Sequence, residues 1–538
     1  MAKQTTAKKG TPTASKKVDV AVIGGGVAGA YSAWRLQKAN GKKSKVALYE
    51  YSDRIGGRLF SRTLPGMPNV VAELGGMRYI PETQPLVTGL INYLKLPTKD
   101  FPMGNPDPEI GASQNYYYLR GEHLTLEELS IKGAVPYNLS WSEQGMNPDQ
   151  LQAYVMNVLV PNAKNLTLED WFKVEVFGTP LYKMGYWNLL NVFLTNEAFS
   201  YMRDAGGYDA NVANASAVAQ LPVSDFGPTT SFRTLTKGYQ DLPLTLAEQF
   251  EADGGEINMN HKLLSIKRLK NGEYELVFTR TKTQDFKTHY DNNSDERIVV
   301  HADKIILAMP RRSLELIEWD QWQENEFLKN NVGSVLIQHA FKLFMGYDYP
   351  WWRALNLWAG RSITDMPIRQ VYYFGCEGDQ PGADPNNTKS LLMASYNDIS
   401  TVPFWKALQN DEPYGGNDKP ENKSIDPVPP AQFVATQSMV EIAHKQVETM
   451  HGQQKLDMPY AAIFHDWSED PYGGGWHEWK AGYRYDEIIK KMVKPVEDQD
   501  VFIIGEAYSN NQGWVEGSLE TAEDMMKRYF KLDYLPRK

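Results

Sequence analysis

The chain has 538 residues, with 56 Lys and Arg against 66 Asp and Glu, a formal charge of −10, and one cysteine. The acidic balance argues against a dedicated nucleic-acid-binding protein, which would need a basic surface. A single cysteine excludes an internal disulfide and any metal centre built from several cysteines, and we expect no metal site. Any redox chemistry must therefore be carried by an organic cofactor.

The N-terminal 17 residues are rich in Lys, Thr and Ala and contain no apolar run. They predict a disordered basic tail, because a secretory signal needs an apolar core of roughly 7–15 residues. The chain also has no uncharged apolar stretch of about 18 residues or more, so we expect no transmembrane helix and no membrane partner. The simplest expectation for its location is the cytoplasm.

A glycine-rich turn follows the first predicted strand. Val18–Ile23 is rich in β-branched residues and predicts a buried parallel strand. It leads into a G-x-G-x-x-G pattern formed by Gly24, Gly26 and Gly29, and residues 30–38 predict a helix. Glycines let the backbone approach a pyrophosphate, which then faces the positive end of the helix. The segment therefore predicts a dinucleotide-binding site.

An acidic residue follows at the spacing that this site requires. A second apolar strand is predicted over residues 46–49 and ends at Glu50, which lies 21 residues after Gly29 (50 − 29). Glu50 can accept hydrogen bonds from both ribose hydroxyls and would repel a 2′-phosphate. Up to this point the ligand could be NAD or FAD. The next segment adds Gly57 and Arg58, which suit a second stretch of pyrophosphate and a ribityl chain.

The middle of the chain alternates between helical and turn-rich segments. Residues 151–220 carry apolar side chains at helical spacing and predict a helical region. Polar segments over 281–297 and 377–389 lie between β-branched runs and predict long hairpin loops. A third polar segment, over 409–430, predicts a surface insertion.

Several motifs, taken together, resemble the flavin-containing amine oxidase superfamily, which includes monoamine, polyamine and L-amino acid oxidases. They are VDVAVIGGGVAGAYSAWRL, ALYEYSDRIGGRLFS, GYQDLPLTLAEQFEADGGEINMNHKLLSI, HADKIILAMPRRSL and VFIIGEAYSNNQGWVEGSLETAEDMMKRY. The resemblance spans almost the whole chain. It implies an α/β (α+β) fold with a Rossmann-like FAD-binding domain of the amine oxidase/glutathione-reductase type, a mixed-sheet substrate domain and a helical domain. The implied segments are 18–85, 235–330 and 460–538 for the FAD-binding domain, 86–150 and 331–459 for the substrate-binding domain, and 151–234 for the helical domain.

The resemblance also implies FAD as the cofactor. The FAD would be bound non-covalently, because Cys376 does not lie where monoamine oxidases carry their thioether link. Glu506 would hold a ribityl hydroxyl, the backbone near Leu263 would contact the adenine, and a helix beginning near Glu516 would face the flavin pyrimidine. The residues expected to contact the cofactor are Gly24, Gly26, Gly29, Glu50, Gly57, Arg58, Gly76, Met77, Arg78, Leu263, Gly505, Glu506, Trp514 and Val515.

Four residues are expected to carry the catalytic site. Arg78, in ELGGMR, occupies the position at which L-amino acid oxidases place an arginine, and its guanidinium can pair two-pronged with a substrate carboxylate. By the same resemblance Tyr396 shares that carboxylate, Lys342 holds a water against the flavin, and Gly513 and Trp514 receive the amino group and Cα. The alternatives are that Arg78 is a surface or phosphate-binding arginine and that Trp514 is a plain core residue.

The side-chain pocket is predicted less fully. Asp398, two residues past Tyr396, is expected to line it, and Asp225 is a weaker candidate. An acidic group there would favour Lys or Arg side chains on the substrate.

The resemblance implies an L-amino acid oxidase with a broad preference or one for basic or large apolar side chains. Hydride transfer from Cα to flavin N5, with O₂ as acceptor, would give a 2-oxo acid, ammonia and hydrogen peroxide. The alternatives on the same fold are a lysine-type amino acid 2-monooxygenase and a polyamine or monoamine oxidase. A non-catalytic FAD-binding protein is disfavoured, because a scaffold has no need of the four catalytic residues. A homodimer or larger homo-oligomer is expected from relatives.

Overall fold

The computed structural model describes residues 16–535, apart from residues 108, 162, 164–165, 222–229, 285–286, 291–295 and 416–433. Most of the predicted basic tail and of the predicted surface insertion therefore lies outside the described residues. The predicted tail extends two residues too far, because Lys16 and Lys17 already belong to the first strand.

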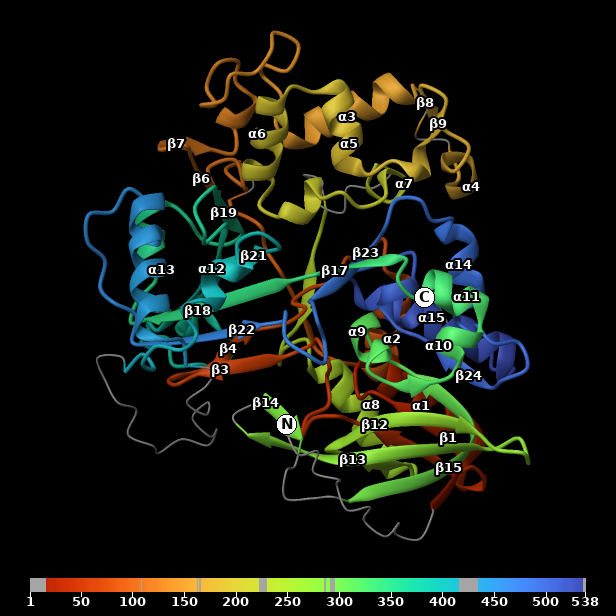
Figure 1. Ribbon diagram of the computed structural model, residues 1–538. Helices are drawn as coiled ribbons and strands as arrows, with labels where there is room; N and C mark the ends of the chain where they lie inside the picture. Colours follow the sequence, from red (N-terminus) through yellow and green to blue (C-terminus); the bar gives the residue numbers. More distant parts are fainter. Residues whose placement is uncertain are drawn as a thin grey trace, which may run out of the picture.

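A nine-stranded sheet is built around the first strand, β1 (Lys16–Ile23), and lies at the bottom of Figure 1. β1 is parallel to its two neighbours, β2 and β15, so its β-branched side chains are buried on both faces. The other strands of this sheet are β2 (Val46–Tyr49), β11 (Glu256–Asn258), β12 (His261–Arg268), β13 (Tyr274–Gln284), β14 (Lys287–Tyr290), β15 (Arg297–Leu307), β16 (Glu318–Trp319) and β24 (Val501–Ile503).

Three helices cover one face of this sheet. They are α1 (Val27–Asn40), α8 (Asp241–Ala252) and α15 (Val515–Tyr529), and they share one apolar core with β1 and β2. α1 lies at the centre: Trp34 is fully buried and donates from Nε1 to Gln249 of α8 at 3.0 Å, and Tyr31 hydrogen-bonds Glu523 of α15. The predicted helix over 30–38 is confirmed and extends further at both ends.

A seven-stranded sheet forms the second layer, at the left of Figure 1. Its strands, in spatial order, are β22 (Ala461–Asp466), β18 (Ala340–Tyr347), β21 (Ser390–Asp398), β20 (Gln370–Cys376), β19 (Arg361–Thr364), β6 (Tyr116–Leu119) and β7 (Glu122–Thr125). α12 (Val402–Lys406) and α13 (Gln437–Met450) pack on it. The boundary predicted at residue 460 is wrong, because β22 pairs with β18 in this sheet rather than with the first one.

The helical region predicted over 151–220 is confirmed and lies at the top of Figure 1. It contains α3 (Pro148–Leu159), α4 (Leu168–Trp171), α5 (Tyr186–Phe193), α6 (Asn196–Gly206) and α7 (Ala217–Gln220), with a short ribbon of β8 (Glu175–Val176) and β9 (Thr179–Pro180). Its first helix begins with a capping box, in which Asn147 and Gln150 bond each other's backbone N–H groups.

Shorter elements connect these layers. They are β3 (Ser61–Leu64), β4 (Met67–Glu73), α2 (Pro85–Leu94), β5 (Thr98–Asp100), β10 (Arg233–Leu235), α9 (Arg311–Glu315), α10 (Gln321–Glu324), α11 (Glu326–Asn331), β17 (Val335–Gln338), β23 (Trp476–Trp479) and α14 (Tyr485–Met492). The predicted hairpin loop over 377–389 joins β20 to β21, and that over 281–297 joins β13 to β15 through β14.

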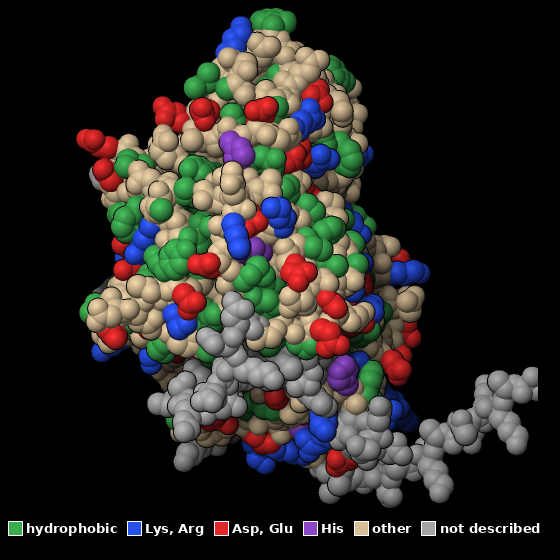
Figure 2. All heavy atoms as spheres, turned by 90° about the vertical axis from the view of Figure 1, so that its left-hand side faces the viewer, with side chains coloured by type: hydrophobic (Ala, Val, Ile, Leu, Met, Phe, Trp, Pro, Cys, Tyr) green, Lys and Arg blue, Asp and Glu red, His purple; other side chains and the backbone are tan. Residues whose placement is uncertain are grey.

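On the face shown in Figure 2, acidic and basic side chains are intermingled rather than gathered by sign. Within the described part of the chain, no helix combines the length and apolar character needed to span a bilayer. The same residues contain no group of three or more His, Cys, Asp or Glu side chains arranged to hold a metal ion.

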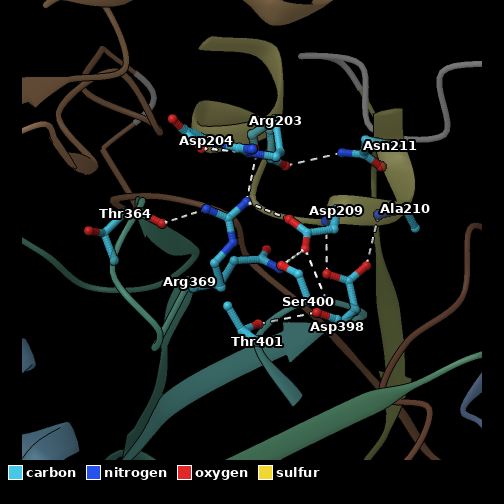
Figure 3. Close-up of polar contacts among 12 residues, drawn as sticks. Arg203, Asp204, Asp209, Ala210, Asn211, Thr364, Arg369, Asp398, Ser400 and Thr401 are labelled. Atoms are coloured by element: carbon cyan, nitrogen blue, oxygen red, sulfur yellow. Dashed lines mark hydrogen bonds and ion pairs between the residues drawn. The ribbon is translucent and has the colours of Figure 1, made fainter. Parts of the chain in front are cut away.

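Asp398 joins the helical region to the second sheet (Figure 3). It is fully buried at the end of β21, and its two carboxylate oxygens accept hydrogen bonds from the backbone N–H groups of Asp209 and Ala210, at 2.8 and 2.9 Å. Arg369 and Ser400 hold the Asp209 carboxylate in turn. Burial, together with the neighbouring Asp209 charge, raises the pKa of Asp398.

The expectation that Asp398 lines the substrate pocket is therefore wrong. The strand alternation does place Asp398 on the same face of β21 as Tyr396. The short helix η5 (Asp209–Val212) lies over that end of the strand and takes up the carboxylate. Asp225, the weaker candidate, lies outside the described residues.

We expect Asp398→Ala to lower the free energy of unfolding by about 1–3 kcal/mol, because two buried backbone N–H groups lose their acceptor. Urea unfolding followed by tryptophan fluorescence measures this. The control, Asp348→Ala, removes a mostly exposed carboxylate paired with Lys389 and should change stability by no more than about 0.5 kcal/mol. Equal effects of the two substitutions would contradict the structural role of Asp398.

A second prediction concerns the turn between β1 and α1. A Cβ at Gly29 would lie 1.8 Å from the carbonyl oxygen of Gly24, whereas a Cβ at Gly26 would make only an ordinary 3.8 Å contact with Gly57. Gly29→Ala must push the helix away from the strand, and we expect it to cost about 1–3 kcal/mol of unfolding free energy. The control is Gly333→Ala, which lies away from the cofactor cradle at a position where a Cβ would meet nothing closer than 3.8 Å, and it should leave the unfolding midpoint nearly unchanged. A Gly29→Ala protein as stable as wild type would refute the close packing.

Candidate active site

One cavity of about 880 Å³ runs from the glycine-rich turn after β1 to the helical region. It is lined by residues of both sheets and, at its far end, by residues of α3, α4 and α7. All expected cofactor and substrate residues line it except Gly29, Asp398 and the undescribed Asp225. Those that do are Gly24, Gly26, Glu50, Gly57, Arg58, Gly76, Met77, Arg78, Leu263, Lys342, Tyr396, Gly505, Glu506, Gly513, Trp514 and Val515.

Glu50 is held in place at the end of the cavity nearest β2. It is buried; one carboxylate oxygen accepts from the backbone N–H of Gly25 at 2.6 Å, and the other accepts from the N–H and hydroxyl of Ser52 at 2.9 and 2.8 Å. Each carboxylate oxygen can accept more than one hydrogen bond. The carboxylate is therefore fixed and retains acceptor capacity for the hydroxyls of a ribose.

The N-terminus of α1 faces the same part of the cavity. Its N-cap, Gly26, provides no side chain to cap the helix, and the first turn contains no acidic residue. Gly57 stands against it: a Cβ there would lie 3.0 Å from the Gly26 Cα. Neither Gly26 nor Gly57 has a side chain that covers the backbone here, so the N–H groups at the start of the helix can donate to an anion. This cradle fits the pyrophosphate of a dinucleotide, and a side chain at either glycine would narrow it.

Arg58, Glu506 and His477 form a charged cluster further along the cavity. Glu506 accepts from Arg58 Nη1 and from His477 Nδ1, each at 2.6 Å, and from the backbone N–H of Gly513 at 2.9 Å. Burial alone would raise the pKa of Glu506, but Arg58 and His477 outweigh it and hold the pKa well below its usual range. A permanent carboxylate at this place, beside the cavity, fits the expected contact with a ribityl hydroxyl.

The last helix begins where the sequence predicts it. α15 starts at Val515, with Trp514 as an N-cap that makes no side-chain capping bond, and both residues line the cavity. The helix start is positioned by Glu516, whose carboxylate accepts from the backbone N–H groups of Leu86 and Val87 at 3.0 and 2.9 Å. With the cradle and Glu50, the cavity offers donors and acceptors suited to the full length of FAD.

Arg78 lies in a box of aromatic side chains on the other side of this helix start. It is only 4 % exposed, and its guanidinium carbon lies 4.2, 5.2 and 5.6 Å from the ring centroids of Phe232, Phe101 and Tyr372. Met103 contributes a sulfur 3.0 Å from Nη1. Aromatic faces stabilise a buried guanidinium, and its planar fork has the geometry to pair two-pronged with a carboxylate. The alternative of a surface arginine is thereby excluded.

Tyr372 reports the electrostatics of this box. Burial alone would raise the pKa of its hydroxyl, but the guanidinium groups of Arg78 and Arg361 outweigh it, and the pKa is lowered. An oxygen at this position is therefore stabilised as an anion. The same field would stabilise the carboxylate of a ligand placed next to Arg78.

Tyr396 and Lys342 lie together beside the box. The Lys342 ammonium is 4.5 Å from the Tyr396 ring centroid and donates to the backbone carbonyls of Glu73 and Gly75 at 3.0 and 2.5 Å. Burial lowers the pKa of Lys342, and the nearby positive charge of Arg78 acts in the same direction. Burial raises the pKa of Tyr396, so its hydroxyl stays a neutral hydrogen-bond donor.

Three aromatic residues complete the walls. Tyr208, which follows α6, packs edge-on against Tyr396 at 5.0 Å and against Trp476 at 6.3 Å. Trp476 also lies over Gly513, where a Cβ would be 3.7 Å from the indole. Trp514 lines the same cavity rather than the core alone, as expected for a residue that contacts a ligand.

Sequence reasoning missed Tyr208, Tyr372 and Arg361. Arg361 opens the strand β19 and precedes the β-branched residues Ile363 and Thr364, and an arginine in such a stretch is a usable signal, since a buried cation needs partners. The sequence around Tyr372 and Tyr208 gives no such signal, because a tyrosine in a strand or after a helix is ordinarily a packing residue.

Comparison with known families agrees with this geometry. Residues 27–412 match the model of a family described as flavin containing amine oxidoreductase. Similar proteins include achacin from Lissachatina fulica, which is 30% identical with 96% of this chain and 94% of that protein covered, and Aplysianin-A from Aplysia kurodai, at 29% with 96% and 90% covered. An L-amino-acid oxidase from Crotalus adamanteus is 21% identical, with 96% and 87% covered.

Among solved structures, a putrescine oxidase bound to putrescine superposes with a TM-score of 0.63 at 16% identity, covering 96% of this chain and 100% of that one. At this identity the likeness supports the fold alone. The family match, the relatives and the dinucleotide cradle agree: the chain belongs to the flavin-containing amine oxidoreductases and is an FAD-dependent oxidoreductase.

Proposed function

We propose that this chain oxidises L-amino acids to 2-oxo acids, with release of ammonia and hydrogen peroxide. The observation that carries the proposal is the buried guanidinium of Arg78 in an aromatic box beside the cavity. A substrate with an α-carboxylate uses this cation, whereas a simple monoamine or polyamine has no group to offer it. The named activity of several relatives, including the oxidase from Crotalus adamanteus, supports the same reading.

The chain's own residues bind and orient the substrate. Arg78 takes the carboxylate two-pronged, and the neutral Tyr396 hydroxyl donates to it, which leaves Cα between Tyr396 and Trp514. FAD, held by the glycine cradle, Glu50 and Glu506, would supply the acceptor for the hydride of Cα and the route by which two electrons reduce O₂ to hydrogen peroxide. Water then hydrolyses the imino acid to the 2-oxo acid and ammonia.

The surrounding groups control water and protons. Tyr208, Trp476 and Trp514 wall the reacting carbon with apolar surface. Lys342, fixed by two carbonyl oxygens, is placed to hold a water beside Tyr396 and to assist the oxygen half of the reaction. The two histidines nearest the cavity, His261 and His477, bond Met259 and Glu506, and neither is assigned as a base.

Two finer features belong to the proposal. A preference for basic or large apolar side chains is consistent with a long, aromatic-walled cavity. The product is assigned as a 2-oxo acid; one relative is a tryptophan 2-monooxygenase from Pantoea agglomerans, 24% identical, so an amide product is the competing outcome.

The direct test is anaerobic mixing of the holoenzyme with each of the twenty amino acids. We expect at least one L-amino acid to bleach the flavin absorbance while its D-enantiomer does not, since with the carboxylate held by Arg78 and Tyr396 and the side chain in the aromatic-walled cavity, the Cα hydrogen of only one enantiomer points at the flavin. Mass spectrometry of the aerobic product should find the 2-oxo acid with stoichiometric peroxide. The proposal fails if no L-amino acid reduces the flavin, and a shortened amide would assign monooxygenation instead.

Arg78→Ala tests the carboxylate site. We expect kcat/KM for the best amino acid to fall by an amount equal to about 2–5 kcal/mol, the scale of a truncated, buried charge pair. Arg233→Ala is the matched control, because Arg233 pairs with Asp100 at the surface, next in sequence to a residue of the box. The kinetics of the Arg233→Ala enzyme should match wild type. Wild-type kinetics in the Arg78→Ala enzyme would show that Arg78 does not bind the substrate.

A further inference from the structure

Glu478 lies on the strand that forms one wall of the cavity. All four residues of β23 border the cavity, and their exposure alternates: Trp476 and Glu478 are partly exposed, whereas His477 and Trp479 are buried. Side chains two apart on a strand share a face. The carboxyl group of Glu478 therefore faces the same cavity as the Trp476 indole.

Two neutral amides hold this carboxyl group. Gln220, at the end of α7, donates from Nε2 to Oε1 at 2.9 Å, and Gln338 of β17 donates from Nε2 to Oε2. Among the described residues, no Lys, Arg or His forms an ion pair with Glu478. Burial raises the pKa of Glu478 to about 8, and the charge of Asp398 adds to this effect. The group is thus rigid, oriented and without a counter-cation.

The cations of the cavity lie elsewhere. Arg78 is in its aromatic box, and Lys342 is fixed below Tyr396. Arg361 hydrogen-bonds Gln370 at 2.9 Å, with its guanidinium carbon 5.9 Å from the Tyr208 ring, and lowers the pKa of Tyr372 with Arg78. These three cations lie around the carboxylate site, whereas Arg58 pairs with Glu506, and none of the four forms an ion pair with Glu478 among the described residues.

The spacing suits an extended side chain. Trp476 lies directly against Gly513, the residue at which the amino group and Cα are expected, and a Cβ there would be 3.7 Å from the indole. Glu478 lies two residues beyond Trp476, roughly 7 Å along the strand. The ammonium of an extended lysine lies about 6 Å from its Cα, from five bonds of about 1.5 Å in zigzag. The length of such a side chain is therefore comparable with the separation of Trp476 and Glu478 along the strand.

We infer that Glu478 is a specificity-determining residue that binds the cationic end of the substrate side chain, so that the favoured substrates are L-amino acids with a side-chain ammonium or guanidinium at lysine length. The inference rests on the proposed L-amino acid oxidation and names the substrate class of the same site. A cation supplies the partner that the described protein lacks, and the two glutamine amides keep the carboxyl group aimed at it.

The test compares L-lysine with L-norleucine, which has the same carbon chain and no ammonium, on wild type and on Glu478→Gln. We expect wild type to favour lysine at least tenfold in kcat/KM. Glu478→Gln should lower kcat/KM for lysine about 10- to 100-fold, mainly through KM, and change that for norleucine less than threefold. Bound FAD and the unfolding midpoint should match wild type.

Gln220→Met separates recognition from bracing, because it removes an amide that orients Glu478 and keeps the carboxyl group. We expect it to lower the lysine kcat/KM less than Glu478→Gln does. The inference is overturned if wild type oxidises norleucine with the same kcat/KM as lysine. It is also overturned if Glu478→Gln lowers kcat/KM equally for lysine and norleucine, or if Gln220→Met does so. If no L-amino acid is oxidised at all, the proposed function itself fails.

Discussion

The close backbone contact between two glycine-rich turns is the constraint on which the rest of the structure depends. Gly24 and Gly29 close the turn from β1 into α1, and Gly26 and Gly57 stand backbone against backbone. This contact fixes Arg58, which binds Glu506 and so positions the loop that leads into α15. A local steric requirement at the end of the first strand therefore helps to determine where the C-terminal helix begins, about 490 residues later in the chain.

Charge burial follows a different rule at the two ends of the cavity. At the cofactor end, the negative charge of Glu506 is balanced by Arg58 and His477, so this carboxylate needs no ligand to compensate its charge. At the substrate end, Arg78 is surrounded by aromatic faces, and Tyr372 registers the excess positive field. A buried guanidinium whose field lowers the pKa of a neighbouring hydroxyl also favours an anionic ligand beside it, because both effects have the same electrostatic cause.

The helical region does more than cover the cavity. Asp398 ties its η5 helix to β21, and this attachment presents Tyr208 to Tyr396 and Trp476. α7 supplies Gln220 to the Glu478 carboxyl group. The two carboxyl groups have different roles. Asp398 accepts hydrogen bonds from backbone N–H groups and anchors the helical region to the sheet. Glu478 is oriented by two glutamine amides and faces the cavity.

The sequence by itself determined the features that depend on local rules. Periodicity and glycine spacing located β1, β2 and the α1 turn, and the helices within 151–220, since a strand, a tight turn and an amphipathic helix each require particular neighbours in the chain. Motif resemblance located Arg78, Lys342, Tyr396 and Trp514, which the fold brings to one cavity.

Only the tertiary structure decided which residues from distant parts of the chain come into contact. The pairing of β22 with β18 moved a domain boundary, because strand partners are chosen by the sheet rather than by the strand. Asp398 has the spacing of a pocket residue, but a turn nearly 190 residues away in sequence covers it. Glu478, Tyr208 and Arg361 gain their roles from neighbours in other layers, and such long-range contacts leave no pattern in the local sequence.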